Sequence, residues 1–194
     1  MIVYQTLRLL FVFIFSVFFR WDVQGRENIP EEGPFIMCAN HFSLWDGPLL
    51  GSLTPRFTRF MAKEELFSTP VLAAVLKLIK VFPVKRHSAD RRAIRTALEA
   101  LKAGHGLGIF PEGTRSPDGE LLPPHAGVAL IAVKSEAPVV PIGIVGPYRL
   151  FQPVRVRIGT PLKFPEYYGV KVKSEQLAEI AQQIMQEIAR LRSS

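Results

Sequence analysis

Short apolar runs alternate with helical patterns along most of this chain, and that alternation limits its fold more than any other feature. Several runs are almost wholly apolar, which is typical of strands that are buried on both faces of a sheet. The runs are "PFIMCAN", "FTRFMA", "KVFPV", "GLGIF", "PVVPIGIVG" and "VRVRIG". Because helical patterns lie between them, the sequence predicts an α/β domain.

Three helices are predicted from Ser88 onward. One is capped by Ser88 and runs to about Ala103, where Gly104 provides the stop. A second, built of small residues, begins at about Ala126. A third begins at Ser174 and carries acidic residues early and basic residues late, as the helix dipole prefers. We expect them to pack on the sheet.

The N-terminal stretch "LRLLFVFIFSVFFRW", Leu7 to Trp21, is rich in Phe, Leu, Ile and Val. Its uninterrupted apolar part, Leu9 to Phe19, is shorter than the roughly 20 residues that a spanning helix needs. A signal peptide also fits poorly, because no small-x-small cleavage site follows. A single membrane span is therefore not favoured.

The residues that flank this apolar run favour a helix at a membrane surface. Arg8, Arg20 and Trp21 suit a helix that lies in the headgroup region of a bilayer. A buried core helix is the alternative. We therefore expect residues 1–21 to form a membrane-associated segment and residues 22–194 to form the folded domain.

The formal charge of +7 and the pI near 9.8 indicate an anionic partner. Nucleic acid, anionic lipid and a phosphorylated substrate all fit that charge. No helix-turn-helix, zinc-finger or RNA-binding signature accompanies the basic residues, and the apolar N-terminus favours lipid. We expect membrane lipid, and no nucleic acid, among the partners.

The single cysteine, Cys38, excludes an internal disulfide framework. It lies inside an apolar run, so we expect a small buried side chain and not a nucleophile. No Cys/His cluster has zinc spacing, and the sequence predicts no metal site.

His41 and Asp46 stand five residues apart in "CANHFSLWDGP". Regular helix or strand would hold them on different faces. They meet if Pro34 to Ala39 is a strand, residues 40–45 form a turn, and Asp46 lies at a helix start with Pro48 in the first turn. The spacing thus predicts a strand-turn-helix corner.

In such a corner the Asp46 carboxylate accepts a hydrogen bond from one ring nitrogen of His41 and leaves the other nitrogen basic. His41 is then a candidate general base. The alternative is a histidine capped by a nearby aspartate in an ordinary loop.

The turn "PEGTRS", Pro111 to Ser116, follows the strand "GLGIF" and resembles an anion site. Gly113 lets the backbone approach a ligand, Thr114 offers a hydroxyl, and Arg115 can grip a phosphate through two hydrogen bonds. An exposed turn is the alternative. Glu112 would repel a bare phosphate, so we expect it to pair with a cation or with a ligand hydroxyl.

Four motifs in order, "NHFSLWDG", "KEELFSTP" through "VFPVKR", "FPEGTRS" and "VVPIGI", resemble the PlsC-like family of 1-acylglycerol-3-phosphate acyltransferases. The resemblance covers about Val23 to Gly146. It implies a mixed, largely parallel sheet flanked by helices, with a membrane-associated N-terminal helix. It also makes residues 22–194 the acyltransferase catalytic domain.

The resemblance also assigns roles to residues. His41 and Asp46 match the catalytic His-x4-Asp motif, and Pro141 matches a proline with a structural or acyl-site role. The positions that match the acceptor-binding motifs are Arg86, Glu112, Gly113 and Arg115, with Thr114 between them.

The chain departs from the family pattern just beyond the "EGTRS" motif. Many relatives have a lysine-containing stretch there, whereas this chain has "PPHAGVALIA" with His125 and Ala126. We expect His125, like His87 and His105, to be a turn or surface residue.

The function that the resemblance implies is acyl transfer in phospholipid biosynthesis at the cytoplasmic face of a membrane. A fatty acyl group passes from acyl-CoA or acyl carrier protein to the free hydroxyl of lysophosphatidic acid, giving phosphatidic acid. No cofactor or metal is expected, and transfer is direct because no serine or cysteine lies in a nucleophile elbow. The alternatives are an acyltransferase for another lysolipid and a non-catalytic lipid-binding protein.

Overall fold

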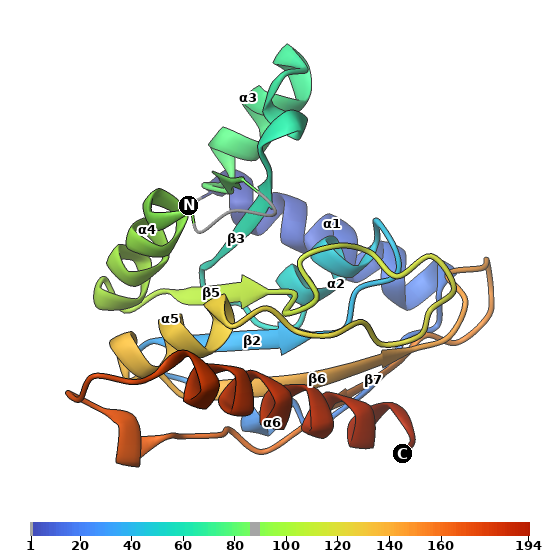
Figure 1. Cartoon of the computed structure of the whole chain (residues 1–194). Coiled ribbons are helices and arrows are strands. Elements are labelled where there is room, and N and C mark those ends of the chain that lie inside the picture. Colours follow the sequence, from blue (N-terminus) through green and yellow to red (C-terminus); the bar gives the residue numbers. More distant parts are fainter. Residues whose placement is uncertain (1, 86–89) are drawn as a thin grey trace.

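A seven-stranded sheet runs through the molecule, with helices on both of its faces (Figure 1). The computed structural model describes residues 2–85 and 90–194. The strand order is β1-β7-β6-β2-β5-β3-β4, and among the described strands only β6 and β7 pair antiparallel. The expectation of a mixed, largely parallel sheet is confirmed. The strands are β1 (Asp22–Gln24), β2 (Phe35–Ala39), β3 (Thr58–Lys63), β4 (Phe82–Val84), β5 (Gly106–Ile109), β6 (Val139–Val145) and β7 (Arg155–Ile158).

The helices divide between the two faces of the sheet. Three of them, α4, α5 and α6, cover one face, while α1 and α2 cover the other (Figure 1). The α-helices are α1 (Ile2–Phe18), α2 (Asp46–Ser52), α3 (Pro70–Leu78), α4 (Arg91–Lys102), α5 (Gly127–Ser135) and α6 (Ser174–Arg192). Short 3₁₀ turns are η1 (Arg26–Asn28), η2 (Glu64–Phe67) and η3 (Pro165–Tyr167).

Strand β2 shows why the central strands must be apolar. All five of its residues are buried, and they alternate between two cores. Ile36 and Cys38 face α4, α5 and α6, whereas Phe35, Met37 and Ala39 face α1 and α2. Burial raises the pKa of the Cys38 thiol and disfavours a thiolate, so the expected buried side chain is confirmed.

The predicted strands are all present, but other elements differ from the sequence prediction. Strand β1 was missed because three residues are too few for a period to show. Ser88, the predicted cap of α4, lies outside the described residues. Asp90 is the cap, because its carboxylate accepts a hydrogen bond from the backbone N–H of Ala93 at 3.0 Å.

Helix α1 has a buried face and an exposed face. Phe15 is fully buried between the sheet and α2, and Tyr4 and Phe19 are also buried. Leu9 and Phe13 are both 58% exposed. No helix in the described ranges is long and apolar enough to cross a membrane. The alternative of a buried core helix therefore holds for one face of α1. The other face is exposed, and the membrane-surface role predicted for this helix would fall on that face.

Candidate active site

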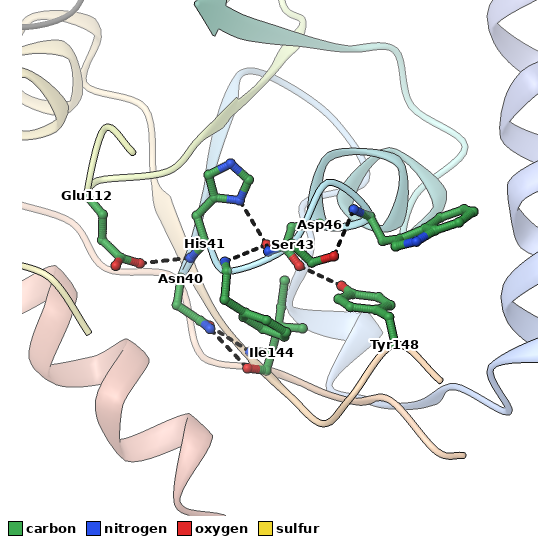
Figure 2. A network of polar contacts seen from close by, with 9 residues as sticks. Asn40, His41, Ser43, Asp46, Glu112, Ile144 and Tyr148 are labelled. Carbon is green, nitrogen blue, oxygen red and sulfur yellow. Dashed lines mark hydrogen bonds and ion pairs between the residues drawn. The ribbon is translucent and has the colours of Figure 1, made fainter. Parts of the chain in front are cut away.

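The predicted corner lies between β2 and α2, at the carboxyl end of a central strand. The turn after β2 brings Nδ1 of His41 to 2.8 Å from Oδ2 of Asp46, the first residue of α2 (Figure 2). Asp46 is fully buried, and the His41 side chain is 13% exposed. The second ring nitrogen of His41 points away from Asp46 (Figure 2). The imidazole is therefore fixed at one end and available at the other.

Four donors converge on the Asp46 carboxylate. Besides His41, the backbone N–H groups of Phe42 and Ser43 donate to Oδ2 at 2.8 and 2.7 Å, and the Tyr148 hydroxyl donates to Oδ1 at 2.7 Å. A buried charge is costly unless it is hydrogen-bonded, and these donors compensate for the loss of water. They also fix where the carboxylate points, and with it the His41 ring.

The ring of Phe110 stacks on His41 from the end of β5. The ring centroids are 4.0 Å apart, and the planes differ by 14°. This contact fixes the plane of the imidazole, while Asp46 fixes its rotation within that plane.

The two motifs found in the sequence meet through their backbones. Glu112 accepts a hydrogen bond from the backbone N–H of His41 at 2.8 Å, and the N–H of Ser116 donates to the His41 carbonyl at 2.7 Å. The turn after β5 therefore holds the turn after β2 on both sides of the catalytic candidate. This meeting follows from topology, since β2 and β5 are parallel neighbours that end at the same edge.

Glu112 makes contacts that the sequence did not indicate. It is buried, and its second oxygen accepts from the backbone N–H of Leu122 at 2.9 Å. Burial raises the pKa of Glu112, and the hydrogen bonds from Leu122 and His41 partly oppose that shift. Backbone N–H groups thus take the place of the cation or ligand hydroxyl that we expected. A direct role in acceptor binding stays a prediction.

The remaining residues of this turn are more open. Arg115 is exposed and makes no hydrogen bond or ion pair with the described part of the chain, while Thr114 is half-buried. Gly113 has a φ of 66°, and a Cβ there would lie 2.6 Å from Cδ2 of His125. Only glycine lets the imidazole of His125 lie against this backbone. His125 itself is exposed, as expected.

Arg86 and His87, which come before α4, lie outside the described residues, so the acceptor-binding role of Arg86 stays a prediction. At the start of α4, the Asp90 carboxylate already accepts from the backbone N–H of Lys85 at 2.9 Å, and such bonds lower the pKa of Asp90. The N-terminus of α4 is thus capped by an anionic side chain.

Pro141 is buried within β6, opposite Cys38 of β2. Its carbonyl accepts from the backbone N–H of Gly159 at 2.9 Å, so its nitrogen faces the side on which β7 has just ended at Ile158. A proline fits there because no hydrogen bond is lost. This placement is structural, and the acyl-site role stays a prediction.

Sequence reasoning missed two residues of the site. Tyr148 follows β6 and reaches Asp46 across 102 positions of sequence. Burial, and then the charge of Asp46, raise the pKa of Tyr148, so its hydroxyl stays protonated and donates. Asn40 forms a pair of hydrogen bonds with the backbone of Ile144, at 3.0 and 2.8 Å, and ties the end of β2 to β6. The signal that could have found them is their position just after strands, since β2 and β6 are parallel and their carboxyl ends lie at one edge of the sheet.

No three His, Cys, Asp or Glu side chains in the described ranges are grouped as a metal site would require.

Comparison with known proteins places this geometry in a family context. The model of the Acyltransferase family matches residues 20–145. The chain is 34% identical over 175 residues to the 1-acyl-sn-glycerol-3-phosphate acyltransferase of Bacillus subtilis (strain 168), covering 87% of this chain and 86% of that protein. It is 36% identical to the chloroplastic 1-acyl-sn-glycerol-3-phosphate acyltransferase BAT2 of Brassica napus, over 66% of this chain and 38% of that longer protein.

A solved structure is similar over nearly the whole chain. The crystal structure of the 1-acyl-sn-glycerophosphate (LPA) acyltransferase PlsC from Thermotoga maritima aligns with a TM-score of 0.72 and 31% identity. The alignment covers 98% of this chain and 79% of that one.

Proposed function

Because this chain belongs to the acyltransferase family, we propose that it transfers a fatty acyl group from an acyl thioester to 1-acylglycerol-3-phosphate, giving phosphatidic acid. The observation that carries the proposal is the contact of 2.8 Å between His41 and a buried Asp46. That contact supplies an oriented base, which is what attack by a hydroxyl group requires. The names of the relatives supply the substrate class.

The reaction begins with His41 as general base. Asp46 holds the Nδ1–H, so the other ring nitrogen takes the proton of the acceptor hydroxyl as that oxygen attacks the thioester carbonyl. Asp46 stabilises the imidazolium that forms. The tetrahedral intermediate then expels the thiolate, which takes the proton back from His41. The ester bond has replaced the thioester bond, and the base is regenerated.

Acyl transfer is direct in this scheme. Cys38, the single cysteine of the chain, is buried with a raised pKa. The thioester donor is acyl-CoA or acyl carrier protein, and either one leaves as a thiolate.

Arg115 and Arg86 are proposed to bind the acceptor phosphate, with Gly113 and Thr114 close to the ligand. The position of Arg115 supports this role, because it is exposed within the turn that contacts His41. Glu112 acts mainly by bracing the His41 backbone.

The enzyme is proposed to act at the cytoplasmic face of a membrane through α1. The exposed residues of that helix support attachment, with Leu9 and Phe13 as examples. Deleting residues 1–21 would also remove the buried Phe15. A Leu9→Gln, Phe13→Gln variant is therefore the better test of attachment.

The function is tested with purified protein, labelled acyl-CoA and acyl carrier protein donors, and a panel of acceptors. The panel contains lysophosphatidic acid, lysophosphatidylcholine and monoacylglycerol, and product mass is measured. We expect phosphatidic acid as the main product. A preference for another lysolipid would replace the acceptor and keep the His41 chemistry, whereas no product from any pair would contradict the proposal.

A further inference from the structure

Exposed apolar side chains gather on segments that leave one edge of the sheet. β2, β3 and β6 belong to the parallel part of the sheet, so their carboxyl ends lie at the same edge as His41. Leu44 follows β2 and is 72% exposed, and α3 follows β3 through η2. Leu150 and Phe151 follow β6. We call these exposed residues the apolar rim: Leu44, Val71, Leu72, Val75, Leu78, Leu150 and Phe151.

Helix α3 is the most unusual part of the rim. Eight of its nine residues are apolar, and only Ala73 is buried. Val71 is 77% exposed and Leu78 is 58% exposed. The helix projects from the body of the protein beyond the end of β3 (Figure 1). A helix that is apolar on all sides is normally buried, so we expect another apolar surface or phase to cover α3.

The charges near α3 indicate what kind of partner covers it. The stretch from Leu66 to Lys80 contains the exposed Lys77 and Lys80 and no carboxylate. Glu64 and Glu65 come before this stretch. They lie 3.9 and 3.0 Å from the amino groups of Lys85 and Lys63, respectively, and are therefore at least partly balanced. Lys77 and Lys80 make no ion pair with the described residues, and an apolar surface with such lysines fits the headgroup region of an anionic bilayer.

One part of the rim, Phe151, joins the exposed face of α1 at Phe18, which is 37% exposed. The backbone N–H of Phe151 donates to the carbonyl of Phe18 at 2.6 Å, and the two aromatic rings are 6.5 Å apart. A protein partner would cover one side of a helix such as α3, whereas lipid can surround it. The occupant is therefore a lipid phase.

We infer that the apolar rim docks on an anionic phospholipid bilayer and turns the edge that carries His41 toward membrane-embedded acceptor. This inference rests on the proposed function for its acceptor, but the docking surface is separate from the catalytic groups. It adds a second region of attachment to α1.

The test uses the full-length chain and vesicles of phosphatidylcholine with or without phosphatidylglycerol. The Val71→Gln, Leu78→Gln variant is compared with Val170→Gln in a flotation assay. Val170 is 58% exposed, as Leu78 is, but it follows β7, which runs antiparallel to β6. We expect at least a tenfold loss of vesicle binding for the rim variant and none for the control. A Lys77→Gln, Lys80→Gln variant should lose about fivefold per lysine, on the anionic vesicles only.

A second measurement separates docking from chemistry. With a short-chain lysophosphatidic acid dissolved as monomers, the rim variants should keep the wild-type kcat, and their circular dichroism should be unchanged. Rim variants that float like wild type would overturn the inference. If the rim variants float normally but have a raised KM for acyl carrier protein, the inference is also overturned, and the apolar rim is then a binding surface for that protein. If wild type does not acylate lysophosphatidic acid, either as monomers or in vesicles, the proposed function fails, while the flotation result still decides the docking surface.

Discussion

The two motifs that meet at the active site differ in how complete they are. Around His41 and Asp46, both the ring and the carboxylate have defined partners, and the carboxylate is fully buried. Around Arg115, the guanidinium is exposed and has no partner among the described residues. Both lie at the same edge of the sheet, held together by the bonds between His41, Glu112 and Ser116.

Under the proposed function, this difference separates the groups that do the chemistry from those that bind the acceptor. A base must be oriented before the transition state is reached, so its contacts are built into the fold. A phosphate-binding arginine can stay hydrated until its ligand arrives and completes the site. We therefore expect losses at the corner to appear in kcat and losses at the turn to appear in KM.

The largest effect is expected for His41→Ala. Removing a general base costs about 10²–10⁴ in rate, and kcat should fall by that factor with little change in KM. His105→Ala is the matched control, because His105 packs against Phe57 before β5, away from the corner. A folded His41→Ala protein that keeps more than a tenth of the wild-type kcat would contradict the base assignment.

Asp46→Asn should lower kcat nearly as much. The amide keeps the shape of the carboxylate, but it cannot stabilise the imidazolium and places donor hydrogens near N–H groups that need an acceptor. The thermal midpoint should fall as well, since Asp46 accepts four hydrogen bonds in a buried place. Normal turnover in the Asn variant would show that the corner needs only its shape and not the charge.

Much of the fold could be predicted because each central strand carries its own signal. β2, β5 and β6 are buried on both faces, so their residues are apolar in unbroken runs. Helix α3 gave no reliable signal, because an apolar helix is expected inside a protein and this one is exposed. The exposed position of α3 is explained by the bilayer that we propose it contacts, and the sequence does not reveal that contact.

The site was predictable only where its residues are close in sequence. His41 and Asp46 are five positions apart, and Pro48 shortly after them indicates a helix start and hence the corner. Tyr148 lies just after β6, far along the chain, and only the sheet order brings it to Asp46. The partners of Glu112 are backbone N–H groups, which no residue type reveals.

An intermediate effect is expected for Arg115→Gln. A hydrogen bond to a charged group contributes roughly 1.5–3 kcal/mol, so kcat/KM for lysophosphatidic acid should fall about ten- to hundredfold, mainly through KM. Monoacylglycerol has no phosphate, so its kcat/KM should change little. Equal losses for both acceptors would show that Arg115 does not bind the phosphate, and a loss confined to kcat would break the contrast between the two regions.

The smallest effect is expected for Tyr148→Phe, which removes one donor from Asp46 and keeps the ring. The ring packs between Phe19 and Phe42, with centroid distances of 5.9 and 5.5 Å, so the variant should fold normally. A typical net hydrogen bond contributes about 1 kcal/mol, and kcat should fall roughly three- to tenfold with KM unchanged. Tyr167→Phe, in η3, is the control.

The pH dependence of the Tyr148→Phe loss distinguishes a positioning residue from a proton donor. The pKa of Tyr148 is raised by burial and by Asp46, so the wild-type hydroxyl stays protonated well above the usual tyrosine range. A positioning role therefore predicts the same fractional loss of kcat from about pH 6 to about pH 9, where an unperturbed tyrosine is also neutral. A loss that grew or vanished across that range would mean that Tyr148 exchanges a proton during turnover. A raised KM with normal kcat would instead show that Tyr148, like Arg115, acts in acceptor binding and not in orienting the base.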